Sequence, residues 1–342
     1  MTQRGPNIAT AGNFYGMFCL VSMPDRPAQA EYPDLHLNLW EHDGDDVSLD
    51  IGLLIDRTFP NPDVYFYLPW KSQGDQIIEL TPRINSANAI AAIFNESWKI
   101  GQVAGSTSIT VENPADGKPL FQVISPNAYL EVDEQGDHSY RLHLAIGRLL
   151  RTETLAAEKI YLRFRVRGVR KEFYAVGLTQ GDRGLVSSWT KDEFIDFRLN
   201  VRRGAPPNLE SQRIRYLSFA KVHLFLMRHR SNELVFQDSA FRSCRSLEDE
   251  HFWARYSHPK AEPSPQELAK ARTHVTRSLG YQWTRRMHGG VPVHEFGILA
   301  RFKRIEISIL SFLIFAVLIG ATGNALWSAI VWIWEKLART CI

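Results

Sequence analysis

Arginines spaced two residues apart are the chain's most distinctive candidates for chemistry. In "YLRFRVRG", Arg163, Arg165 and Arg167 alternate with apolar residues, and in "FIDFRLNVRRG" the same alternation carries Arg198 and Arg202. Because successive side chains of a β-strand point to opposite faces, we expect these arginines to line one polar face. The planar, permanently charged guanidinium group suits phosphate oxygens, so these five residues are our candidate anion-binding set.

Two interpretations of this arginine face stay open. If the two strands are neighbours, the face is about 20 Å long by strand geometry and could hold the phosphates of a nucleotide or short oligonucleotide. Alternatively, it is a solvent-facing sheet surface that happens to be basic. Asp196, which lies among the arginines, favours local pairing and therefore the second interpretation.

No local motif indicates catalysis or metal binding. The chain lacks a Gly-x-Ser-x-Gly elbow, a phosphate-binding Gly-rich loop, a dinucleotide fingerprint and a His-Glu-x-x-His pair. The fragment "HDGDD" lacks the glycine at the sixth position and the glutamate at the twelfth position of a calcium loop, and the three cysteines are too widely spaced for a metal site. We therefore expect no catalytic residue, no metal and no cofactor, with a site assembled from distant residues as the remaining route to an enzyme.

Charge is distributed unevenly along the chain. Residues 1–140 hold 7 Lys and Arg against 19 Asp and Glu, whereas residues 141–242 hold 20 against 10. Such polarisation indicates either an anionic partner for the basic part or acidic and basic parts that face one another.

The elements that must position the arginines are mainly predicted strands. Residues 35–40 and 47–56 form an expected hairpin around an Asp-Gly turn. A helix is expected over 86–95 with Ser86 as N-cap, and another from Ser264, which forms a capping box with Glu267, to Gly280. Short strands at intervals of roughly 10 to 15 residues predict an antiparallel β-sandwich-like soluble region rather than a parallel α/β sheet.

The composition divides the chain into five expected parts. The breaker "GAPPN" suggests a boundary at Gly204 within the soluble region. The parts are a cytosolic β-rich domain (1–204), its β or mixed continuation (205–260), a juxtamembrane basic helix and linker (261–304), a single transmembrane helix (305–335) and a short tail (336–342).

The uncharged run 307–334 predicts one transmembrane α-helix. It is long enough for a single crossing but too short for two. Arg301, Lys303 and Arg304 precede it, and Lys336 and Arg339 come after it, so the positive-inside rule places the N-terminal part in the cytoplasm. With no recognisable signal peptide, we expect a single-pass, tail-anchored protein of the inner (cytoplasmic) membrane.

Small and polar residues recur every fourth position in this span. Ala316, Gly320, Asn324 and Ser328 therefore form one stripe along the helix. Such stripes let helices approach closely, and an asparagine in hydrocarbon favours an interhelical partner. The stripe predicts homo-oligomerisation in membrane lipid, and it leaves open whether the assembly is a pore or only a packing seam.

In its order of parts, the chain resembles membrane effectors of bacterial anti-phage defence systems. In those proteins a soluble sensor of a nucleotide or oligonucleotide signal is joined to a transmembrane segment. The resemblance implies a non-enzymatic effector whose ligand gates or assembles an oligomeric pore, with a nucleotidyltransferase as partner. The alternatives are a tail-anchored scaffold or adaptor that oligomerises through its span, and a membrane-bound enzyme with a dispersed site.

Overall fold

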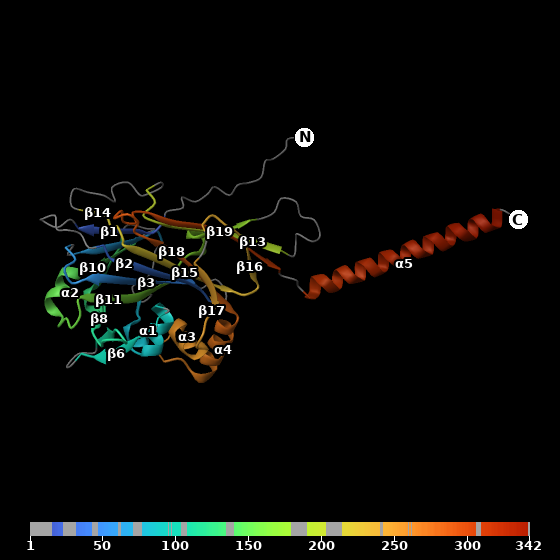
Figure 1. The fold of residues 1–342 in the computed structure, drawn as a ribbon. Helices are drawn as coiled ribbons and strands as arrows, with labels where there is room; N and C mark the ends of the chain where they lie inside the picture. Colours follow the sequence, from blue (N-terminus) through green and yellow to red (C-terminus); the bar gives the residue numbers. More distant parts are fainter. Residues whose placement is uncertain are drawn as a thin grey trace.

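The structure, a computed structural model, describes most of the chain. The described residues are 16–22, 32–42, 47–60, 63–70, 77–94, 96, 98–103, 108–134, 140–178, 190–202, 214–239, 242–258, 260, 262–305 and 309–340. Over these residues the predicted architecture, mainly β with one C-terminal apolar helix, is confirmed (Figure 1).

A ten-stranded sheet, the large sheet, forms the centre of the soluble part. Its order is β17-β18-β15-β2-β3-β11-β8-β7-β6, and β5 adds to β11. The expected hairpin is present as β2 and β3, and its neighbours β15 and β11 come from far along the chain. The sequence predicted antiparallel pairing, but two pairings in this sheet, β15 with β2 and β11 with β8, are parallel. The bounds are β2 Asp34–Glu41, β3 Val47–Asp56, β5 Ile77–Glu79, β6 Lys99–Gln102, β7 Ile109–Glu112, β8 Pro119–Val123, β11 Lys159–Arg167, β15 Lys221–His229, β17 Ser243–Ser246 and β18 Ser278–Arg286.

Two smaller sheets complete the β architecture. One has the order β14-β1-β4-β10-β9, with bounds β1 Phe18–Ser22, β4 Val64–Leu68, β9 Leu130–Glu134, β10 Tyr140–Leu144 and β14 Ile214–Tyr216. The other, the small sheet, has the order β12-β13-β19-β16, with bounds β12 Ala175–Leu178, β13 Thr190–Leu199, β16 Asn232–Gln237 and β19 Phe296–Ile305. Their apolar side chains form one buried core with one face of the large sheet, as in a β-sandwich.

The opposite face of the large sheet is covered by helices (Figure 1). A second core joins the apolar residues of that face to those of α1, α3 and α4. The helix bounds are α1 Ala87–Phe94, α2 Ile146–Thr152, α3 Glu250–Ser257 and α4 Pro265–Thr276. Between the apolar residues this helix-covered face also carries charged and polar side chains, and we call it the polar face.

The sequence predicts the positions of α1 and α4 well, but it does not predict the strands that follow α4. Ser264 and Glu267 form the predicted capping box, and Ser86 accepts the predicted hydrogen bond near the start of α1. The helix ends at Thr276, however, and Gly280 lies inside β18. The part expected as a juxtamembrane helix and linker (261–304) also contains β18 and all but the last residue of β19, which are integral strands of two sheets. The expected boundary at Gly204 lies outside the described residues, but β14 and β15, which follow it in the chain, pair with β1 and β2, which precede it.

The C-terminal helix α5 (Ile309–Thr340) extends away from the sheets (Figure 1). Within it, Ala316–Trp334 has a mean hydropathy of 1.6, and none of this window is buried. Among the described residues it is the one helix that is long and apolar enough to cross a bilayer. The single-span prediction is therefore consistent with the structure.

Candidate ligand-binding site

Two of the five candidate arginines lie in the interior. Arg163 and Arg165 are 0% and 1% exposed, because β11 is in the middle of the large sheet and its polar face lies beneath α3. The predicted alternation along β11 is correct, since the interleaved Phe164 and Val166 pack into the opposite core. The prediction of an accessible arginine face is wrong for these two residues.

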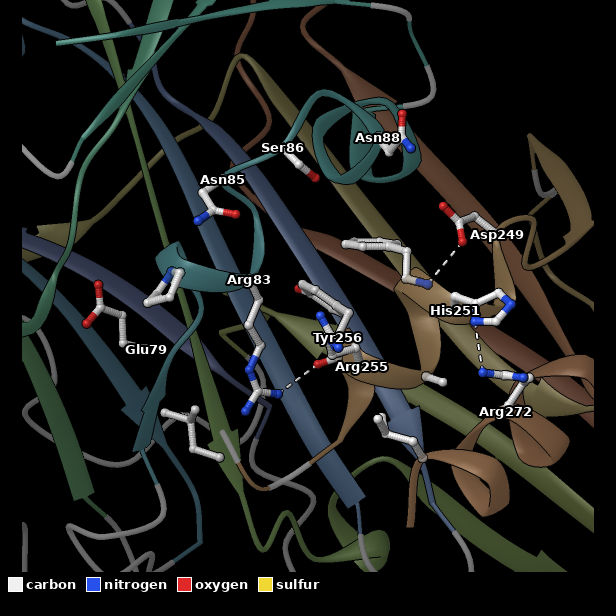
Figure 2. Close-up of a pocket in the computed structure, with 15 residues that line it drawn as sticks. Glu79, Arg83, Asn85, Ser86, Asn88, Asp249, His251, Arg255, Tyr256 and Arg272 are labelled. Atoms are coloured by element: carbon white, nitrogen blue, oxygen red, sulfur yellow. Dashed lines mark hydrogen bonds between the residues drawn. The ribbon is translucent and has the colours of Figure 1, made fainter. Parts of the chain in front are cut away.

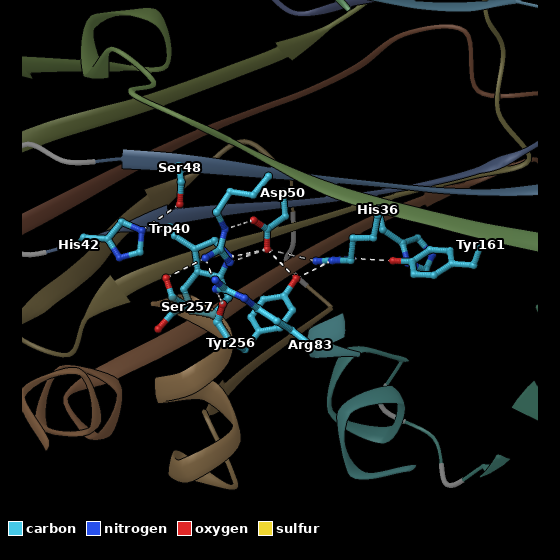
Figure 3. Close-up of polar contacts among 11 residues, drawn as sticks. His36, Trp40, His42, Ser48, Asp50, Arg83, Tyr161, Tyr256 and Ser257 are labelled. Carbon is cyan, nitrogen blue, oxygen red and sulfur yellow. Dashed lines mark hydrogen bonds and ion pairs between the residues drawn. The ribbon is translucent and has the colours of Figure 1, made fainter. Parts of the chain in front are cut away.

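Asp50 on β3 is the counter-charge for both buried arginines (Figure 3). Arg165 donates from Nε to its Oδ1 at 2.5 Å and from Nη2 to its Oδ2 at 3.1 Å, and Arg163 Nη2 lies 3.5 Å from Oδ2. Tyr256 and Trp40 donate to the same carboxylate at 2.7 and 2.9 Å. Burial alone would raise the pKa of Asp50, but the two arginines and the tyrosine hold that pKa below its ordinary value.

Arginines also bind the carbonyl groups at the end of α3. Arg165 donates to the carbonyl oxygens of Tyr256 and Ser257 at 3.1 and 2.7 Å. Arg83, from the 3-10 turn Thr81–Arg83, donates to the carbonyls of Tyr256 and Lys260, each at 3.0 Å. The last carbonyls of a helix have no partner within it, so these contacts attach α3 to the sheet. The buried arginines thus serve the fold.

The remaining candidate arginines do not join them. β13 belongs to the small sheet, so the two arginine strands are not neighbours and the condition for one continuous arginine face is not met. Arg198, whose side chain is 33% exposed, donates from Nε to Asp196 at 2.8 Å, as local pairing predicted. Arg202 lies 5.3 Å above the Tyr216 ring, and Arg167 is half-buried at the end of β11. The five residues therefore form no common surface.

One cavity on the polar face lies between the start of α1 and the helices α3 and α4 (Figure 2). Its volume of about 850 Å³ is within the usual range for ligands. Two of its three arginines already have protein partners, since Arg83 binds backbone carbonyls and Arg272 Nη2 lies 2.8 Å from His251 Nδ1. This cavity therefore offers little charge for a ligand.

A second cavity, of about 400 Å³, combines aromatic and charged side chains at the other end of α1. We call it the aromatic–basic cavity. Its aromatic lining residues are Phe94, Trp98, Phe121 and Phe225, its basic ones Lys159, Lys221, Arg242 and Arg286, and its acidic ones Asp34, Glu96 and Glu158. They come from α1 and several strands of the large sheet, which the fold brings together.

Two neutral histidines also line this cavity. His36 on β2 and His223 on β15 lie opposite each other, with ring centroids 4.9 Å apart. Burial and nearby positive groups lower the pKa of His223 to about 3 and that of His36 well below its ordinary value. His223 Nδ1 contacts the Thr284 hydroxyl at 2.8 Å and the Gln282 amide at 3.1 Å. Each neutral ring has one donor and one acceptor nitrogen.

Positive charges are crowded in the aromatic–basic cavity. Burial lowers the pKa of Lys221, and Arg286 and Arg242 lower it further, while Asp34 and Glu96 oppose them. Burial raises the pKa of Asp34, which weakens it as a counter-charge. An anion bound beside Lys221 would therefore relieve a repulsion that the protein leaves partly uncompensated.

Trp98 contributes a donor that the described residues do not satisfy. Its indole Nε1 is buried and has no hydrogen-bond partner among them. A buried N–H without a partner is costly, so such groups are frequent at ligand sites. Tyr161 further connects this region to the Asp50 network, since its hydroxyl accepts from Arg163 at 2.6 Å and lies 3.5 Å from His36 Nδ1.

The small residues of α5 lie on open helix surface. A Cβ atom added at Gly320 would meet nothing within 4 Å, and Ala316 is exposed. Ser328 donates its hydroxyl to the Asn324 carbonyl at 2.9 Å, so its hydrogen-bonding demand is met within the helix. The side-chain amide of Asn324 makes no hydrogen bond to the described residues.

Comparisons with known proteins identify no family. No family model matches the chain, and no curated protein matches it. Among solved structures, the Fcho1 Mu homology domain of Danio rerio with bound Eps15 peptide aligns over 86% of this chain and 80% of that one, at 11% identity. Its TM-score of 0.13 is too low to support any argument about fold or function.

Sequence reasoning missed the aromatic–basic cavity, although one signal was present. Asp34 and His36 are spaced two apart, as are Lys221 and His223, so each pair shares a strand face. What brings the pairs together is the parallel register of β2 and β15, which aligns Lys221 with Asp34 and His223 with His36. A pairing between strands nearly 190 residues apart leaves no local pattern.

Proposed function

We propose that this protein is a single-pass membrane receptor whose soluble part binds a nucleotide-like anion in the aromatic–basic cavity. Ligand occupancy would then change the association of the α5 helices in the membrane. The observation that carries the proposal is one cavity that combines four aromatic and four basic residues, in a chain that ends in a candidate span. The proposed mechanism uses binding energy alone and requires no catalytic residue.

Aromatic rings and bases together favour a ligand with a flat ring and a phosphate. Phe94, Phe121 and Phe225 offer surfaces on which a nucleobase can stack. Lys221, Arg286 and their neighbours can neutralise phosphate oxygens by charge-assisted hydrogen bonds. The volume of about 400 Å³ lies near the lower end of the range for small-molecule sites, which favours a mononucleotide-sized group.

The neutral histidines would give the site its selectivity. Nδ1 of His36 and of His223 already faces a protein group, which leaves Nε2 of each ring to donate or accept one hydrogen bond with the edge of a heterocyclic base. Because burial keeps both rings uncharged near neutral pH, they would recognise a ring edge rather than compete for phosphate. The unpartnered Trp98 N–H would supply a further donor.

Association of α5 would provide the output. Gly320 lets helices approach closely, and Asn324 carries an amide that prefers an interhelical partner in hydrocarbon. A ligand shifts such an equilibrium only if it binds one association state better than the other. In this proposal the receptor is a cytosol-facing effector of the inner membrane, of the kind used in anti-phage defence, and a nucleotidyltransferase supplies its ligand.

Ligand binding is tested by titrating the full chain in detergent with AMP, ATP, GTP, cyclic dinucleotides and short oligoadenylates. We expect at least one to bind, and Lys221→Gln with Arg286→Gln to weaken it by roughly 10- to 100-fold per lost charge-assisted bond. The matched control, Lys118→Gln with Arg198→Gln, removes two charges outside the cavity and should bind normally. Absence of binding throughout, or equal losses in both variants, would contradict the proposal.

Coupling to the membrane is tested separately. Chemical crosslinking of the full chain in vesicles, with and without the bound nucleotide, should show a change in oligomer that Asn324→Leu reduces. Leakage of trapped ions then distinguishes a pore from a packing seam. Binding without any change in crosslinking would favour the scaffold alternative, in which α5 only anchors and associates.

A further inference from the structure

The end of the small sheet nearest the span is unusually basic. Only residues 306–308 separate the end of β19 at Ile305 from the start of α5 at Ile309 (Figure 1). The strand register places Arg304 beside Lys191 of β13 and beside Asn232 of β16. If α5 crosses a bilayer, this end of the small sheet is the part of the soluble region closest to the lipid headgroups.

The large sheet brings further arginines to the same end. His229, the last residue of β15, pairs with Ser278, the first residue of β18. Arg230 and Arg277 flank that pair, and the Arg230 amide donates to the Arg277 carbonyl at 2.6 Å. The turn after Arg230 leads directly into β16 and so back to Arg304. Two sheets therefore contribute to one corner.

Positive groups surround His229, as expected if the two sheets bring their arginines together at this corner. Burial lowers the pKa of His229, and Arg304, His274, Arg277 and Arg230 each lower it further. The three arginines are exposed, so their charges face solvent. Among the described acids near this end, Glu233 is exposed across from Lys303, and Asp192 is buried and accepts from Arg301 at 2.7 Å. Glu41 and Glu193 bind Arg228, the residue before His229. The three exposed arginines thus gather at one corner of the soluble part.

We propose that Arg230, Arg277 and Arg304, the membrane-proximal corner, dock onto anionic headgroups of the bilayer that α5 crosses. The docking fixes the soluble part in one orientation on the membrane. Basic residues held at a headgroup surface each contribute roughly a fivefold preference for anionic lipid, and the effect declines within a Debye length. This inference shares with the proposed function only the premise that α5 crosses a bilayer.

Not every basic residue near the span belongs to this corner. Arg285 and Arg286 lie at the opposite end of β18, roughly 25 Å from Ser278 by strand geometry. Arg286 lines the aromatic–basic cavity, and Arg285 Nη1 donates to the Glu295 carbonyl at 3.1 Å. The corner is thus defined by the fold and not by closeness in sequence to α5.

The test uses the full chain in nanodiscs of phosphatidylcholine, with or without about one third phosphatidylglycerol. Amide hydrogen exchange is measured by mass spectrometry over residues 228–234. We expect exchange several-fold slower in the anionic discs, and a loss of that difference in the triple variant Arg230→Gln, Arg277→Gln, Arg304→Gln and in about 0.5 M salt. Inorganic phosphate added to neutral discs should not slow exchange, because the proposed ligand is the headgroup surface.

The control is a second triple variant, Lys118→Gln, Arg151→Gln and Arg285→Gln, which removes the same charge from exposed sites elsewhere. It should keep the lipid dependence. Equal exchange of the wild-type chain in both discs, equal losses in the two triple variants, or full protection by free phosphate would each overturn the inference. Failure of α5 to insert into either disc would instead overturn the membrane premise of the proposed function.

Discussion

Strands β11 and β13 carry the same pattern of arginines alternating with apolar residues, yet the fold treats them differently. In β11, Arg163 and Arg165 are buried and converge on Asp50. In β13, Arg198 remains one third exposed and pairs with Asp196 two residues away on its own strand. The difference lies in what covers each strand: α3 lies over the polar face of β11, but the side chain of Arg198 still reaches solvent.

The comparison teaches that alternation identifies a strand and its two faces but not which face meets solvent. A buried charge needs a counter-charge and hydrogen bonds to be tolerated, and Asp50 of the neighbouring strand β3 supplies them to the arginines of β11. An exposed charge needs neither. Four sets of variants test this contrast between the two strands and their surroundings, and their expected effects differ widely in size.

Replacing Asp50 by Asn should have the largest effect. It would leave the positive charges of Arg163 and Arg165 buried without a carboxylate, which typically costs about 3–5 kcal/mol. Urea unfolding of the full chain in detergent measures the loss. The matched change on β13, Asp196→Asn, should cost less than about 1 kcal/mol. Similar losses in the two variants would show that the two arginine strands are equivalent after all.

Gly52→Ala should destabilise by about 1–3 kcal/mol through overpacking. A Cβ atom there would collide with the Tyr161 hydroxyl and lie 3.0 Å from Arg163 Nη1, in a region that is fully buried. Gly177 of β12 in the small sheet has open space at the same position, so Gly177→Ala serves as its control and should be nearly neutral. The midpoints of thermal unfolding of the two variants measure this difference. Equal midpoints would contradict tight packing around Arg163.

The neutral histidines of the polar face should make stability depend on pH. Their pKa values are lowered in the folded protein, so below about pH 6.5 the unfolded chain binds protons that the folded one does not. Stability should therefore fall as the pH falls from about 6.5 towards about 3, by up to about 1.4 kcal/mol per pH unit for each ring.

The variant His223→Gln should flatten this decline in a series of urea unfolding curves. Replacement of His294, which is exposed on the surface, by Gln provides the comparison. An unchanged slope in His223→Gln would mean that the buried pair does not control acid sensitivity.

The smallest effect is expected for Arg198→Gln with Arg202→Gln. Since Arg198 forms only a partly exposed pair and Arg202 stacks on Tyr216, the double variant should lose about 1 kcal/mol or less. Its nucleotide affinity should equal that of the wild-type chain, because neither residue lines the aromatic–basic cavity. A marked loss of affinity would restore the arginine face of β13 as a ligand site.

Much of the fold can be predicted from local patterns in the sequence. The β2–β3 hairpin, the capping box of α4 and the alternation of side chains between the two sheet faces along β11 and β13 depend on residues close in the chain, and each is confirmed. The apolar span in α5 depends on composition alone, which is why it could also be predicted.

The candidate site could not be found in this way because its physics is long-range. Helix α3, "EHFWARYS", has only eight residues, and no local pattern indicated that it would cover Arg163 and Arg165. The aromatic–basic cavity depends on the parallel contact of β2 with β15 and on the position of the last turn of α1. Both are set by tertiary packing.

The connection between β19 and α5 has a mechanical consequence. β19 is an inner strand of the small sheet, with ten residue pairs to β13 on one side and further pairs to β16 on the other. If α5 crosses a bilayer, a load on it would reach the small sheet through Ile305 and would be shared by hydrogen bonds on both edges of β19. An edge strand has such bonds on one side alone, so β19 is better placed than β12 or β16 to carry that load into the sheet.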